Sequence, residues 1–209
     1  MIEQAAAAPK VRSTPRITLG FGICVLLIIL CLFERQGLFL YFLLAAAVHE
    51  GAHIFAIYML GGSAAEFKLG LLGGVIYLSD STLFSYGQDV LIALSGSIGG
   101  LFAAFISSTV WRITGIDDFA VFAGASAVIA IFNFLPAIPL DGGIVMHKAL
   151  CAFMLPDRAD MICRCFSFCV ALVLTVLGGY VFLICGANPT LMIAGVYLIC
   201  SSLRAQGIY

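Results

Sequence analysis

Charged side chains are scarce in this chain. Asp, Glu, Lys and Arg make up 10% of its 209 residues, against about 25% in an average soluble domain. The formal net charge is -1, so the chain lacks the basic field that draws proteins to nucleic acid. Hydrophobic residues make up 63%, and the mean hydropathy is +1.15. This composition argues against an ordinary soluble domain and favours an integral membrane protein in a lipid bilayer.

Heptad repeats, low-complexity linkers and long polar insertions are also lacking. Residues 1–16 are a short polar tail, and residues 17–209 are expected to form a single integral membrane domain. A helical crossing needs about 20 apolar residues. The sequence therefore predicts an α-helical polytopic protein with about six transmembrane helices, at residues 17–33, 38–60, 89–111, 119–136, 161–185 and 189–203. The first run is read as a retained anchor, because no small-x-small cleavage site follows it.

Basic residues indicate the orientation of these helices. With six crossings, both termini share one side with eight of the ten basic residues, and the other side has only Arg35 and Arg112. Short loops rich in Lys and Arg face the cytoplasm. We therefore expect a multi-pass protein of a bacterial cell membrane with cytoplasmic termini.

Residues 61–85 have a different texture from the apolar runs. Glycines at 61, 62, 70, 73 and 74 flank two short runs at 66–69 and 75–78, which is typical of a β-hairpin. An open sheet edge cannot face lipid. We expect a short membrane-associated hairpin that lies at the interface or lines a cavity.

The strongest local motif is His49-Glu50-Gly51-Ala52-His53, in the middle of the second apolar run. Histidines four residues apart share one helix face, so both rings can bind one Zn²⁺, and the intervening Glu can act on the metal-bound water. Ionisable residues at this depth cost free energy and are by default functional. The motif predicts a zinc site with His49 and His53 as ligands and Glu50 as general base.

A catalytic zinc needs a third protein ligand. Asp141 is the preferred candidate because it lies in a broken helix beside two glycines that allow close backbone approach. His147 is expected to be a packing or interfacial residue, because Lys148 beside it suggests the membrane edge. Asp80 and Asp89 flank a polar loop and are read as solvated.

Prolines at 136 and 139 break the fourth apolar run, and a helix is expected to resume at Gly142 and reach about residue 155. Asn133 stands where this break begins. Its amide suits two roles: donation to a substrate carbonyl or oxyanion, or capping of the interrupted backbone. The residues alone do not choose between these roles.

These motifs together resemble the site-2 protease family of intramembrane metalloproteases. The resemblance rests on the H-E-x-x-H motif followed much later by Asn133-x-x-Pro136-x-x-Pro139-Leu140-Asp141-Gly142-Gly143, and it covers about residues 38–155. Residues 73–75 look like the glycine-containing loop of the stage IV sporulation protease branch. Ser95-Gly96-Ser97 looks like a degenerate form of the family's Ala-Gly-Pro motif. The PDZ domain of one branch and the regulatory C-terminal domain of another are not expected.

The resemblance implies a three-helix catalytic core that holds one zinc per chain through His49, His53 and Asp141. It further implies that Glu50 is the general base and that Asn133 helps to bind the scissile peptide. The expected substrate is a membrane-bound protein cleaved in or near a transmembrane segment, in regulated proteolysis of the signalling or sporulation type. Regulatory membrane proteins are possible further partners.

Two other features of the sequence leave alternatives. A metal transporter or sensor would use the same ligands, but it would also need acidic or His-rich entry sites, which the helices lack. Cys163, Cys165 and Cys169 form a loose cluster whose spacing matches no zinc pattern. We treat these cysteines as small apolar residues.

Overall fold

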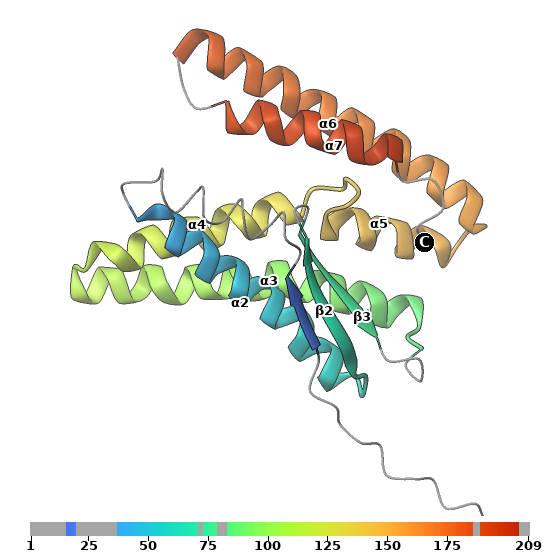
Figure 1. The fold of residues 1–209 in the computed structure, drawn as a ribbon, viewed down its shortest axis with the longest axis horizontal. Coiled ribbons are helices and arrows are strands. Elements are labelled where there is room, and N and C mark those ends of the chain that lie inside the picture. The colour runs from blue at the N-terminus through green and yellow to red at the C-terminus, as the bar shows by residue number, and fades with distance from the viewer. Residues whose placement is uncertain (1–15, 20–36, 71–72, 79–82, 186–188, 205–209) are drawn as a thin grey trace, which may run out of the picture.

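The computed structural model describes residues 16–19, 37–70, 73–78, 83–185 and 189–204. Within these ranges six helices accompany a small sheet (Figure 1). The helices are α2 (Leu38–Met59), α3 (Tyr86–Thr114), α4 (Asp117–Asn133), α5 (Asp141–Cys151), α6 (Pro156–Cys185) and α7 (Thr190–Arg204), and the strands are β1 (Arg16–Leu19), β2 (Ala64–Gly70) and β3 (Gly73–Leu78).

Three of the described helices are long and apolar enough to cross a membrane: α2, α3 and the segment Pro156–Ile184 of α6. Residues Thr190–Ser202 of α7 form a shorter apolar helix. These helices support a membrane protein, and the count of six crossings stays a prediction. Helix α6 begins five residues before the predicted span. Its first turns carry Asp157, Arg158 and Asp160, and hydropathy does not assign such charged residues to a crossing.

The predicted first crossing at residues 17–33 is wrong at its start. Residues Arg16–Leu19 form strand β1, and residues 20–36 lie outside the described part of the chain. The sequence Arg-Ile-Thr-Leu alternates polar and apolar side chains, which is the period of a strand. Most of the predicted tail (residues 1–15) and most of the predicted first helix (residues 20–33) lie outside the described residues.

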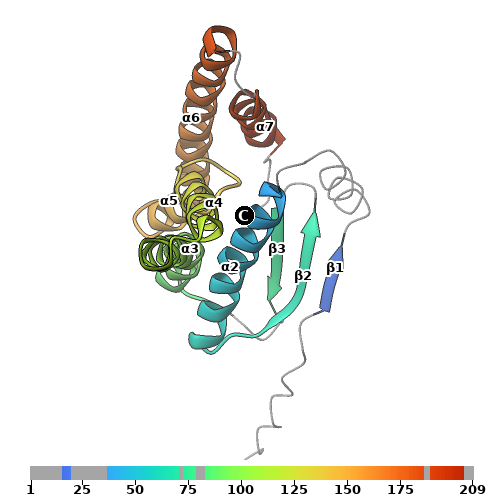
Figure 2. The same cartoon turned by 90° about the vertical axis from the view of Figure 1, so that its left-hand side faces the viewer.

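The sheet has the strand order β1-β2-β3. Strands β2 and β3 pair antiparallel, with Phe67 opposite Ile76, and they occupy the region in which the sequence indicated a hairpin. Strand β1 pairs parallel to β2, with Ile17 opposite Phe67, and this third strand was not foreseen. The sheet lies on one side of α2 and α3 lies on the other (Figure 2).

Helix α3 is the centre of the bundle and packs against α2, α4 and α5. Its buried face is made of small residues: Ala93, Gly96, Ser97, Gly100, Ala104 and Ser107. A Cβ on Gly100 would stand 3.1 Å from the Cβ of Ala130 in α4. Apolar surface alone drives little helix association in lipid, and small residues let backbones approach closely. This face therefore brings α2 and α4 close to the same helix.

The expected break between α4 and α5 is present, and α5 begins at Asp141 and ends at Cys151, short of the predicted residue 155. Gly142 and Gly143 pack directly on the backbone of the break. A Cβ on Gly142 would overlap the carbonyl of Phe134, and one on Gly143 would lie 2.6 Å from the carbonyl carbon of Ala137. Only glycine fits at both positions, so the two glycines set the entry of α5 and the position of Asp141.

Candidate metal centre

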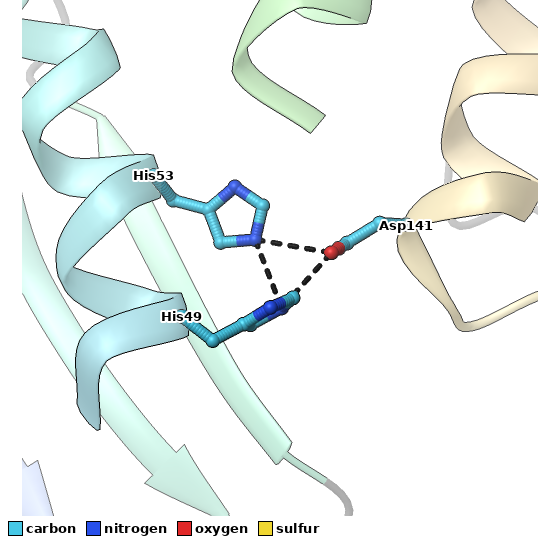
Figure 3. A group of neighbouring side chains, drawn as sticks. All are labelled: His49, His53 and Asp141. Atoms are coloured by element: carbon cyan, nitrogen blue, oxygen red, sulfur yellow. Dashed lines mark hydrogen bonds and ion pairs between the residues drawn. The ribbon is translucent and has the colours of Figure 1, made fainter. Parts of the chain in front are cut away.

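The two histidines of the motif lie on the inner face of α2. His49 and His53 are 4% and 8% exposed, and four residues separate them, so both rings project from one side of the helix. Asp141 is the first residue of α5 and its side chain is 16% exposed. The break between α4 and α5 brings this carboxylate to the two rings (Figure 3).

The three side chains meet at one point. The Nε2 atoms of His49 and His53 lie 3.0 Å and 3.1 Å from Oδ2 of Asp141, and 3.3 Å from each other. Among the described residues, this trio is the group of His, Cys, Asp or Glu side chains that could hold a metal ion. Asp141, which the sequence indicated as the third ligand, is the third member of this group.

The hydrogen bond on the far side of His53 tests whether these residues fit a metal. Nδ1 of His53 lies 2.7 Å from the carbonyl oxygen of Ile92. A carbonyl only accepts, so Nδ1 carries the hydrogen and Nε2 of the neutral ring carries a lone pair. That lone pair faces the carboxylate oxygen of Asp141. The arrangement needs a cation among the donors, either a bound metal or an added proton.

The donor separations agree with a metal. Ligand atoms bound at 2.0–2.1 Å in a tetrahedron stand about 3.3 Å apart, close to the three separations observed here. Two imidazoles and one carboxylate suit zinc, and three protein ligands leave one position for water. The donor set therefore fits a catalytic type of zinc site.

Residues 92–96 of α3 form the outer wall of this centre. Ser95 donates from Oγ to the carbonyl of Ile92 at 2.6 Å, and that carbonyl also accepts from His53. Gly96 lies against the imidazole of His53, because a Cβ on this residue would overlap the ring. The sequence marked this wall only through the likeness of residues 95–97 to a degenerate Ala-Gly-Pro motif. The signal that could have marked it is the pair Gly96 and Gly100, spaced for one face of a membrane helix.

The other two predicted site residues do not join the trio directly. Glu50 follows His49 on α2, is partly exposed, and is close enough for its charge to act on His53. Asn133 ends α4, and its Nδ2 donates to the carbonyl of Ile129 at 3.0 Å. This contact lies within α4 and is neither the expected cap on the interrupted backbone nor a contact to a substrate, so both roles of Asn133 stay predictions.

His147 is not part of the centre. It is 4% exposed, and its Nε2 lies 2.6 Å from Oδ1 of Asp160 in α6. The buried ring, bonded to Asp160, agrees with the expectation of a packing residue, and its place relative to the membrane edge stays a prediction. Asp89, expected to be solvated, is paired with Lys148 at 3.0 Å.

The three clustered cysteines also lie outside any metal-binding group of the described residues. Cys163 is buried, whereas Cys165 and Cys169 are exposed on α6. Their reading as small apolar residues stays a prediction.

Comparisons with known proteins bear on the fold. No protein-family model matches the chain, and no curated protein matches its sequence. A solved structure, described as Site-2 Protease from Methanocaldococcus jannaschii, is similar to it with a TM-score of 0.69. The two share 16% sequence identity, over 92% of this chain and 91% of that one. At this identity the likeness shows a common fold.

The wall at Gly96 predicts a sensitive position. Gly96→Ala should displace the His53 ring, because the added methyl group would occupy its place, and zinc binding should weaken by about tenfold or more. The measurement is zinc affinity of the purified protein by competition with a chelator. Gly87→Ala on the same helix is the matched control, since a Cβ there meets nothing within 4 Å. Equal affinity in the two variants would contradict the placement of His53.

Proposed function

We propose that this chain is an intramembrane zinc metalloprotease of the site-2 protease family, nearest to its stage IV sporulation branch. The observation that carries the proposal is the convergence of Asp141, from the start of α5, on His49 and His53, which lie in the middle of a helix apolar enough to cross a membrane. The shared fold with a Site-2 protease structure supports it. Ionisable side chains buried within a membrane cost free energy, so such a trio is by default a functional site.

The chain's own residues divide the chemistry of peptide hydrolysis. Zinc held by His49, His53 and Asp141 would supply a Lewis acid and lower the pKa of a water molecule. Glu50 takes the proton from the attacking water and passes it to the leaving amine. Asn133 uses one amide hydrogen on Ile129, and the second is the one that would bind the scissile carbonyl.

Replacing the general base separates hydrolysis from metal binding. Glu50→Gln should lower cleavage of a co-expressed membrane protein by about 10²- to 10⁴-fold, while zinc content stays near one per chain because Glu50 is not a ligand. His49→Ala, His53→Ala and Asp141→Ala should lose most of the zinc. Asn133→Ala should keep zinc and lower turnover. Metal analysis and immunoblotting of the substrate measure the two properties.

The same variants test the alternative of a metal transporter or sensor. A transporter should be little affected by Glu50→Gln, because it needs the ligands and not the base. Full cleavage by Glu50→Gln would refute the protease. Full zinc in Asp141→Ala together with loss in His147→Ala would move the third-ligand role to His147.

Strand β3 is the part of the sheet that we assign to substrate binding. It ends the strand order of the described residues, so one edge has no strand beside it there, and it lies on the α2 side of the sheet (Figure 2). A peptide must be extended to expose its carbonyls to hydrolysis, and an open edge can pair with an extended segment. The substrate is accordingly a membrane-bound protein with a segment that can unwind.

Proline substitutions in β3 test this assignment. Neighbouring residues of a strand direct their N–H groups to opposite edges, so Val75→Pro and Ile76→Pro remove one donor each, one towards β2 and one at the open edge. Whichever of the two variants removes the donor at the open edge should lower cleavage several-fold. Its zinc content should be unchanged, because the ligands lie elsewhere. Wild-type cleavage by both variants at equal expression would sink the idea of substrate pairing.

We also propose that the termini are cytoplasmic and that the chain crosses a bacterial cell membrane several times. Two contacts between helices agree with this topology, because each joins residues that it places on the same side of the membrane. Lys148 near the end of α5 meets Asp89 at the start of α3, and Tyr41 at the start of α2 donates to Asp118 at the start of α4 at 2.7 Å. Eight of the ten basic residues fall on the side of the first contact under this topology.

Reporter fusions test the orientation. Fusions after Arg204 and within residues 61–85 should report the cytoplasm, and a fusion near Asp117 should report the outer side, because short basic loops stay inside. An outer location for Arg204 together with a cytoplasmic location for residues 61–85 would show that the number of crossings is miscounted.

A further inference from the structure

The α6–α7 hairpin contacts the rest of the described chain mainly around Asp141. Ala137 and Leu140 share a buried cluster with Ala171 of α6 and Leu198 of α7. Ile138 packs against Cys163 of α6, with Met146 and Leu150 of α5 beside them. In Figure 1 the hairpin lies above α4 and α5. The hairpin therefore packs on the segment that carries Asp141.

Ser167 makes the first polar contact of this interface. It is fully buried. Its Oγ accepts a hydrogen bond from the backbone N–H of Ile138 at 2.9 Å and donates to the carbonyl of Cys163 at 2.7 Å. The other N–H groups of the break at residues 134–140 bond within the break or to the end of α4, and its two prolines have none. Ile138, three residues before Asp141, is thus held by α6.

His147 makes the second polar contact, six residues after Asp141. Its ring is buried and bonds Asp160 of α6 at 2.6 Å. The thiol of Cys151 also lies near this ring, 3.7 Å from Nε2 and 4.0 Å from Nδ1. The pair therefore ties α5 to α6.

We propose that Ser167 and the His147–Asp160 pair are positioning residues for the metal ligand Asp141. The inference rests on the metal site of the proposed function. Contacts on both sides of Asp141 fix the place of its segment relative to α6. Metal–ligand distances tolerate only about 0.2 Å of change, so a small shift of this segment moves Oδ2 away from the two histidines and weakens metal binding without removing a ligand.

A matched pair of hydroxyl variants tests the role of Ser167. Ser167 and Thr175 both donate to the carbonyl four residues earlier in α6, each at 2.7 Å, but only Ser167 also accepts from Ile138. Ser167→Ala should lower the zinc affinity of the full-length protein by about tenfold. Thr175→Val should leave it within about twofold, because its contacts stay within the hairpin.

A double-mutant cycle tests the His147–Asp160 pair. His147→Gln and Asp160→Asn should each lower zinc affinity by about tenfold. The double variant should lose no more than either single variant, because all three lack the same contact. Thermal unfolding in excess chelator is recorded for every variant. A purely structural role would lower this metal-free stability and leave the zinc affinity unchanged.

The outcomes separate this inference from the function on which it rests. Wild-type protein without zinc affinity would refute the metal site, and this inference with it. Zinc binding by the wild type with equal affinities for Ser167→Ala and Thr175→Val would overturn the inference for Ser167 and leave the protease standing. Wild-type affinity in both single variants of the pair would do the same for His147 and Asp160.

Discussion

The contact on which the rest of the structure depends is the meeting of Asp141 with His49 and His53. Three donor atoms within 3.3 Å of one another repel unless a cation lies among them. The two histidines come from one helix turn, and their spacing is a property of any α-helix. The carboxylate arrives from a different element, so the fold is arranged to deliver it and to hold it there.

Delivery of Asp141 depends on the break between α4 and α5. Backbone groups freed by such a break are costly in lipid unless other groups bond them. Here turns within residues 134–140 satisfy most of them, and Ser167 satisfies Ile138. Contact with α6 therefore completes the hydrogen bonding of the break that precedes Asp141.

Close packing around the centre depends on glycine. Gly96 leaves room for the ring of His53, and Gly142 and Gly143 leave room for the backbone of the break. In lipid, the burial of apolar side chains favours helix contact only weakly, so small residues and buried hydrogen bonds carry more of the association. These positions therefore accept little change, although none of them is a donor to the metal.

Much of the centre could be predicted from the sequence because its signals are local: the histidine spacing on one helix face, a lone Asp beside two glycines, and prolines that end a helix. Helices α2 and α3 were also predicted closely, since apolar length decides a crossing. The pairing of β1 with β2, the contact of Gly96 with His53 and the bonds of Ser167 and His147 to other elements could not be predicted. Each joins residues far apart in the chain, and only tertiary packing decides which partner a backbone N–H or an imidazole finds.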